Sequence, residues 1–180
     1  VKAGMGLLGE HWVLLPVFGE RVFVWKQSGT LSMSLLFGAR GVGALIGSLF
    51  SGYLAKNKPV RMRKGIFYGF LIVAAGYMAL SGASSIWWAC AFIILGHIGT
   101  SLSWVYSTTM LHQMTEDRFR GRVFSADYAG LFLVMSAVSF AAAYMVDMGV
   151  SVRWVTFGTG LIGILPALMW YAARKRHFGD

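Results

Sequence analysis

Glu10, Arg40 and His97 are ionisable residues that lie inside apolar stretches of this 180-residue chain, where charge is costly. If these stretches are helical, each residue lies about 12 to 17 Å from the outer end of its stretch, near the midplane of a bilayer about 30 Å thick. We expect them to share a polar interior in which Glu10 and Arg40 could pair, and all three are candidates for substrate or proton coupling. The alternatives are a static ion pair beside a structural histidine, and a first stretch that continues beyond Arg21 and shifts the depth of Glu10.

Polar residues recur at helical spacing in the stretch that contains His97. At intervals of three and four residues the chain places His97, Thr100, Ser101, Trp104, Ser107, Thr108 and Leu111. These positions share one face of a helix, so the pattern predicts either a water-filled cavity or a seam of hydrogen-bonding hydroxyls between helices. Ser101, Trp104 and Thr108 are therefore candidate cavity residues. For Trp104, stacking on a ligand and packing in the core are the two alternatives.

A cluster of basic residues lies a short distance before Asp127. It consists of Arg118, Arg120 and Arg122, with Gly121 between the last two. Near a helix end, Asp127 could pair with one of these arginines or accept hydrogen bonds from exposed backbone N–H groups. These five residues are candidates for a gate on the cytoplasmic side, and the alternative is interfacial charge with little energetic value.

The residue patterns of common enzyme and metal sites are absent from the sequence. It contains no GxSxG, no HExxH and no P-loop, and its one cysteine, Cys90, lies in an apolar stretch. Ser101 and Ser103 are too close to His97 on one helix for a serine–histidine dyad. His97 and His112 would lie at different depths of the same helix. We therefore expect no catalytic residue, no metal and no cofactor, and an intramembrane enzyme is the least favoured function.

Five apolar stretches long enough to cross a bilayer carry most of these residues. The chain is 57% hydrophobic and 13% charged, whereas a soluble protein has about 25% charged residues. The stretches are Leu31–Ala55, Gly65–Gly82, Ile86–Leu111, Val123–Val146 and Arg153–Ala173, and a shorter sixth is Val1–Phe18. None alternates like a strand of a membrane barrel. We expect an all-α integral membrane protein, a bundle of six transmembrane helices with a truncated first helix, in which residues 1–180 form a single domain without a soluble part.

The distribution of basic residues predicts the orientation of the bundle. Eleven lie in alternate gaps and near the end of the chain, namely Lys56, Lys58, Arg61, Arg63, Lys64, Arg118, Arg120, Arg122, Arg174, Lys175 and Arg176. The remaining gaps contain Arg21, Lys26 and Arg153. By the positive-inside rule, the richly basic gaps face the cytoplasm. Topology and attraction to anionic membrane lipid account for the formal net charge of +9, so we expect no nucleic-acid partner.

Glycine and proline predict local features of the helices. Gly43 and Gly47 have the GxxxG spacing that allows close helix packing in lipid. A helix that packs closely in order to slide is the alternative. Pro16 and Pro166 are expected to interrupt their helices.

Three segments resemble parts of a known transporter family. "LLPVFGERVF" (Leu14–Phe23) is similar to the end of helix seven of the major facilitator superfamily, "ARGVGALIG" (Ala39–Gly47) to helix eight, and "TEDRFRGRVFSAD" (Thr115–Asp127) to the loop into helix eleven. The likeness extends over essentially all 180 residues, and the chain most resembles the drug- and siderophore-exporting branch typified by the enterobactin exporter. It implies the C-terminal half of a twelve-helix fold, with a six-helix N-terminal half as partner, substrate at the midplane and alternating access by rocking.

The same resemblance implies a function. We expect a secondary active exporter of an amphipathic small molecule such as a drug or siderophore, coupled to protons, in the inner membrane of a bacterium. In the family, helices seven, eight, ten and eleven line the cavity, which matches the positions of Glu10, Arg40, His97, Trp104 and Asp127. Lys56 stands where the family's gating motif has an acidic residue, and Lys2 is expected inside the membrane near its inner face. The alternative is a non-transporting six-helix binding or assembly protein.

Overall fold

The described part of the chain is a bundle of helices. The computed structural model describes residues 1–24, 29–56 and 58–179. Its elements are α1 (Lys2–Gly6), α2 (His11–Val17), the π-helical turn η1 (Phe18–Val22), α3 (Gly29–Ala55), α4 (Pro59–Ser81), α5 (Ile86–Met114), α6 (Asp117–Asp147), α7 (Val152–Ile162) and α8 (Ile164–Phe178). Five spans are long and apolar enough to cross a membrane, namely α3, α4, α5, α6, and α7 with α8. The predicted all-α membrane fold is confirmed, while Lys26 lies outside the described residues.

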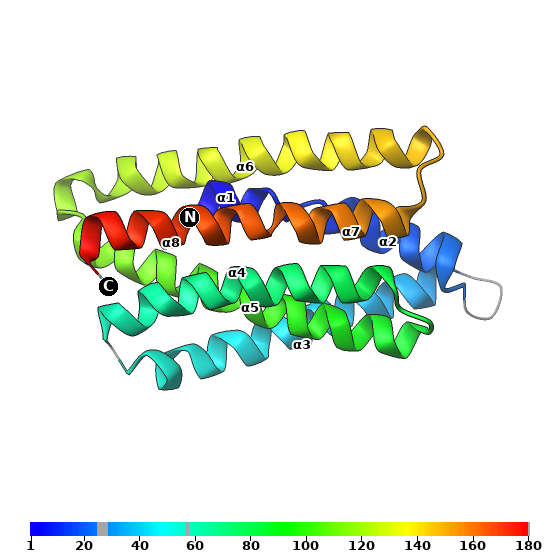
Figure 1. Cartoon of the computed structure of the whole chain (residues 1–180), viewed down its shortest axis with the longest axis horizontal. Coiled ribbons are helices and arrows are strands. Elements are labelled where there is room, and N and C mark those ends of the chain that lie inside the picture. Colours follow the sequence, from blue (N-terminus) through cyan, green and yellow to red (C-terminus); the bar gives the residue numbers. More distant parts are fainter. Residues whose placement is uncertain (25–28, 57, 180) are drawn as a thin grey trace.

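The helices run side by side along the long axis of the molecule (Figure 1). α4 packs against α5, α7 and α8, α5 also packs against α3, and α6 packs along α1. Large apolar side chains cover the outside: Tyr53, Leu133 and Phe140 are 72%, 74% and 74% exposed. Such a surface suits lipid rather than water, so the chain is part of a multi-pass membrane protein.

Glycines allow α3 to lie directly on α5. A Cβ atom added at Gly47 would lie 2.6 Å from the carbonyl oxygen of Ile98 and 2.8 Å from Cβ of Ser101. One added at Gly43 would lie 2.9 Å from Cα of Ile94. Side chains do not fit at such distances, so a larger residue would force the two helices apart. The GxxxG spacing therefore marks a closely packed seam.

Replacing Gly43 by alanine is expected to destabilise the bundle by about 1–3 kcal/mol, because the added methyl group overpacks the seam. Gly41→Ala is the matched control, since no atom lies within 4 Å of a Cβ atom added there. This control should keep or raise the melting temperature, because alanine favours the helix. Thermal unfolding of the detergent-solubilised protein measures both, and equal melting temperatures for the two variants would contradict the packing.

The first apolar stretch is a broken helix. Turns at Leu7–Glu10 separate α1 from α2. Pro16 lies inside α2, and η1 begins directly after the end of α2. An irregular turn is expected here, because proline has no backbone N–H to donate. The stretch ends at Val22, so the predicted outer end near Phe18 is wrong by about one turn. Glu10 then lies about 18 Å from the outer end, still close to the midplane.

A second helix break faces the first. α7 and α8 are separated at Gly163, close to Pro166, where the sequence predicts an interruption. A Cβ atom added at Gly163 would lie 2.8 Å from Cδ2 of Leu8, and one added at Gly4 would lie 2.7 Å from Cβ of Pro166. The two interrupted helices therefore lie against each other, and Glu10, at the end of the first break, is fully buried.

Candidate functional site

A cavity of about 330 Å³ lies beside the break in the first helix. Residues of α1, α2, α3, α4, α5 and α6 line it, and most of them are apolar or aromatic. Three sequence-predicted candidates, Arg40, His97 and Trp104, meet at this cavity. Leu8 and Gly9, which lie in the turns between α1 and α2, are among the residues that line it.

His11, Trp12, Arg40 and His97 form the polar corner of the cavity. The rings of His11 and His97 meet edge to face with centroids 5.1 Å apart, and the guanidinium carbon of Arg40 lies 4.7 Å from the ring centroid of Trp12. Nδ1 of His11 lies 3.2 Å from the carbonyl oxygen of Leu8, which can only accept, so a neutral His11 has its lone pair on Nε2.

Three nitrogen atoms of this corner are buried and lack a hydrogen-bond partner in the described part of the chain. They are Nε2 of His11, Nε2 of His97 and Nε of Arg40. Buried polar atoms are usually paired, so a group of unpaired ones suits a ligand that supplies the partners. Sequence reasoning missed His11. The available signal was an ionisable residue next to Glu10 in the same apolar stretch.

Glu10 does not face Arg40. Its carboxyl group is fully buried, and neither oxygen has a hydrogen-bond partner among the described residues. Thr159 of α7 lies close to it, but the Thr159 hydroxyl donates to the carbonyl of Val155 at 3.1 Å. The predicted Glu10–Arg40 pair is therefore wrong for this conformation. The break turns Glu10 towards α7, while His11 and Trp12 face the cavity.

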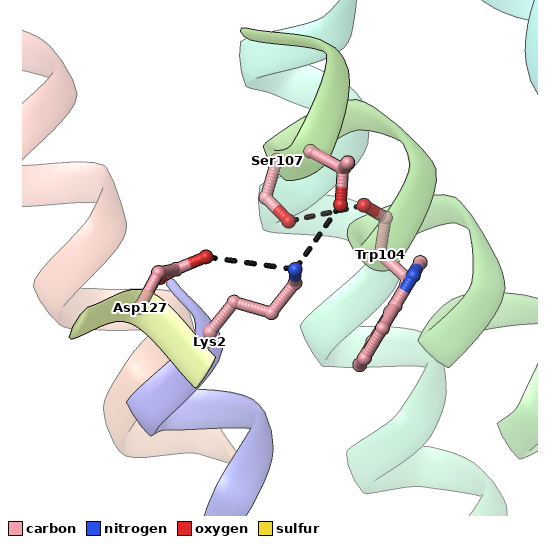
Figure 2. A network of polar contacts seen from close by, with 5 residues as sticks. Lys2, Trp104, Ser107 and Asp127 are labelled. Atoms are coloured by element: carbon pink, nitrogen blue, oxygen red, sulfur yellow. Dashed lines mark hydrogen bonds and ion pairs between the residues drawn. The ribbon is translucent and has the colours of Figure 1, made fainter. Parts of the chain in front are cut away.

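Lys2 joins three other candidates into one network (Figure 2). Its side chain is fully buried, and Nζ lies 3.5 Å from Oδ2 of Asp127 and donates to Oγ1 of Thr108 at 3.1 Å. The same Nζ lies 4.1 Å from the ring centroid of Trp104 and 4.4 Å from that of Tyr128. Figure 2 shows the ammonium group between Asp127 on α6 and Trp104 on α5. A carboxylate and two aromatic faces thus stabilise a charge in the interior.

Asp127 therefore pairs with Lys2. The pair with one of the nearby arginines that the sequence suggested does not form in the described part of the chain. α6 begins at Asp117, so Asp127 lies about 15 Å inside the helix rather than at its end. Asp127 also lines a second cavity of about 210 Å³, together with Ser107. Because Trp104 lines the central cavity, Lys2 contacts a wall residue of each cavity.

The other gate candidates lie in the first two turns of α6. Arg118 Nε donates to Glu116 at 2.9 Å, and Arg120 pairs with Asp117 at 2.6 Å. Both acidic partners are largely exposed, and ion pairs of this kind contribute little to stability. The two remaining candidates, Gly121 and Arg122, are exposed at the start of α6.

The polar stripe of α5 serves three different neighbours. Ser101 does not line the cavity, because its hydroxyl donates to the carbonyl of Ala44 on α3 at 2.9 Å. Thr100 and Trp104 line the cavity. Thr108 belongs to the Lys2 network. Both interpretations of the stripe, a cavity wall and a hydrogen-bonded seam, therefore apply to different residues.

Comparisons with known proteins match nearly the whole chain. The family model described as Major Facilitator Superfamily matches residues 7–178. Similar curated proteins, each named Uncharacterized MFS-type transporter YcaD, come from Salmonella dublin (30% identical over 161 residues) and Salmonella arizonae (29% identical over 161 residues). Each match covers 86% of this chain and 41% of the relative, so the chain spans about two-fifths of their length. No solved structure matches the chain.

Proposed function

The chain belongs to the Major Facilitator Superfamily, and from this premise we propose that residues 1–180 form the C-terminal six-helix half of a secondary active exporter. The curated relatives are named transporters, and the match leaves more than half of their length for a second half. The exporter that we propose lies in the inner membrane of a bacterium. It exports an amphipathic small molecule, such as a drug or siderophore, by alternating access coupled to protons.

The observation that carries this proposal is the central cavity. Its volume of about 330 Å³ lies within the range of small-molecule sites, which is about 300–1,000 Å³. It lies at the break between α1 and α2, and interrupted helices near the midplane are typical of substrate sites in secondary transporters. Apolar walls with a few polar groups would suit an amphipathic substrate.

Proton coupling is supported by the ionisable groups around the break. Glu10, His11 and His97 all lie buried in the bundle, where ionisable side chains usually mark ion or proton pathways. The imidazoles line the cavity, and Glu10 lies directly before His11 in the chain. A proton on any of these groups would therefore change the charge next to the bound substrate.

The contacts of the serine residues favour transport over an enzyme. Ser101 donates to Ala44, and Ser103 donates to the carbonyl of Ile66 at 3.4 Å. Neither hydroxyl is paired with His97, although a serine nucleophile needs a base within reach. Across the residues that the structure describes, no three His, Cys, Asp or Glu side chains are grouped to hold a metal ion.

Flux through the whole transporter in proteoliposomes tests this proposal. With an acidic lumen and an alkaline exterior, we expect accumulation of an amphipathic probe that stops when an ionophore collapses the pH gradient. Anionic, neutral and cationic naphthalene derivatives serve as probes, and protein-free liposomes are the control for passive partitioning. If the protein moves none of the three classes above that control, the exporter proposal is rejected in favour of a binding or assembly role.

A further inference from the structure

We propose that the central cavity selects amphipathic organic anions, and that Arg40 binds their carboxylate while the aromatic walls hold an apolar ring system. This inference rests on the exporter function proposed above and names the class of its substrate. It is carried by the charge, the unpaired atoms and the shape of the cavity.

Among the described residues that line the cavity, one side chain carries a permanent charge, and that charge is positive. The side chain is that of Arg40, whereas no described lining residue is an aspartate or glutamate. The buried acid closest in sequence, Glu10, faces Thr159 instead, and Asp127 is paired with Lys2. A cationic substrate would therefore enter without a counter-ion, which is costly in a low-dielectric interior. An anion meets a fixed positive charge.

Among the described residues, one buried nitrogen of the Arg40 guanidinium group, Nε, lacks the hydrogen-bond partner that a buried donor normally has. The group lies over the ring of Trp12 at 4.7 Å. Arginine presents a planar fork of N–H donors that matches the two oxygens of a carboxylate. An arriving carboxylate would supply the missing acceptor and would neutralise a charge that is costly at this depth.

The histidines extend this polar corner. Because Nδ1 of His11 donates to the carbonyl of Leu8, Nε2 of a neutral His11 accepts hydrogen bonds. His97 presents a second unpartnered Nε2 within the same corner. The corner would thus bind a carboxylate at Arg40 and would accept a hydrogen bond from a hydroxyl group of the same molecule at His11.

The remaining walls suit an aromatic or apolar body. Trp12, Phe70, Trp104 and Phe132 contribute rings from α2, α4, α5 and α6, and Met5 and Met135 add flexible thioethers. Aromatic rings stack on one another at low cost, and methionine adapts its shape to irregular ligands. A bicyclic aromatic carboxylate therefore combines both halves of the recognition.

Equilibrium binding to the purified whole transporter tests this inference without requiring transport. The probes are 2-naphthoate, its neutral amide and the cationic 2-naphthylmethylammonium. Quenching of the protein's tryptophan fluorescence measures their binding. We expect 2-naphthoate to bind at least about tenfold more tightly than the other two probes, because one charge-assisted hydrogen bond contributes that much affinity. Arg40→Gln should abolish this difference, and Arg40→Lys should keep only part of it, because lysine keeps the charge but lacks the fork.

Arg21→Gln is the matched control, since it removes the same charge from an exposed residue of η1 that does not line the cavity; this variant should bind 2-naphthoate like the parent. A rise of the parent's melting temperature with 2-naphthoate, but not with the amide, is a second readout that needs no variant. Equal affinities for the three probes would overturn the anion site even if flux is observed. Anion-selective, Arg40-dependent binding without gradient-driven flux of any probe would instead reject the exporter function and leave the anion site standing.

Discussion

Asp127→Asn is expected to destabilise the bundle by on the order of 3 kcal/mol, because it leaves a fully buried ammonium group without its counter-ion. Lys2 would keep the hydroxyl of Thr108 and the aromatic faces of Trp104 and Tyr128. These contacts are weaker than a charge pair in an interior of low dielectric constant. Thermal or denaturant unfolding of the whole transporter in detergent measures the loss.

Two further variants separate a buried pair from a general effect of charge removal. Asp117→Asn removes the same kind of charge from the same helix, but Asp117 is 89% exposed and its pair with Arg120 is a surface contact, so we expect little change. Replacing both Lys2 by methionine and Asp127 by asparagine should recover most of the stability, since no unpaired charge remains. If Asp127→Asn unfolds like the Asp117→Asn variant, the pair does not stabilise the bundle.

The number and positions of the long helices could be predicted from the sequence because the bilayer imposes their length. A helix needs about 20 apolar residues to cross the hydrocarbon core of a bilayer, so a run such as Ile86–Leu111 is recognisable as a membrane span from its length. The ends were less accurate: α4 begins at Pro59 and α6 at Asp117, whereas hydropathy placed these starts at Gly65 and Val123. Charged first turns lie at the membrane surface, so hydropathy does not detect them as helix.

The partners of the buried charges could not be predicted from depth alone. Helical rise placed Glu10 and Arg40 at similar depth, but a shared depth does not fix the direction in which a side chain points. The turns at Leu7–Glu10 break the helical phase, and no proline marks them. As a result Glu10 lies close to Thr159 of α7, while the adjacent His11 lines the cavity together with Arg40.

The cavity-lining face of α5 was predicted only in part, because Ser101 and Thr108 of that face contact Ala44 and Lys2 instead. His97 and Trp104 lie on one face of the unbroken α5, and the structure places both on the cavity wall. The sequence places Asp127 near a helix end because the apolar run begins at Val123, four residues before it. The true start of α6 lies six residues earlier, which moves Asp127 inwards to Lys2. The use of hydropathy to place the start of α6 therefore also led to the wrong partner for Asp127.

Glu10→Gln is expected to abolish the dependence of flux on the pH gradient while leaving the fold intact. Both carboxyl oxygens are buried without a hydrogen-bond partner in the described part of the chain. A residue kept only for stability would not leave an acid in this state, because an ionised carboxyl group costs free energy there. The neutral amide has the same shape, so the free energy of unfolding at neutral pH should rise by on the order of 1 kcal/mol, and the melting temperature should rise with it.

This opposite response of stability and coupling distinguishes a proton-coupling acid from a structural one. Residues that are needed for activity often lower the stability of the folded protein, and replacing them then raises stability at the expense of activity. Glu20→Gln is the matched control: it makes the same change in the same interrupted segment, but at an exposed position, so flux and melting temperature should both stay near the parent values. The decisive measurement is probe accumulation in proteoliposomes with and without a pH gradient, with melting curves for each variant. Gradient-driven flux that survives Glu10→Gln, or a clear fall in its melting temperature, would place Glu10 among the structural residues and shift the coupling role to His11 and His97.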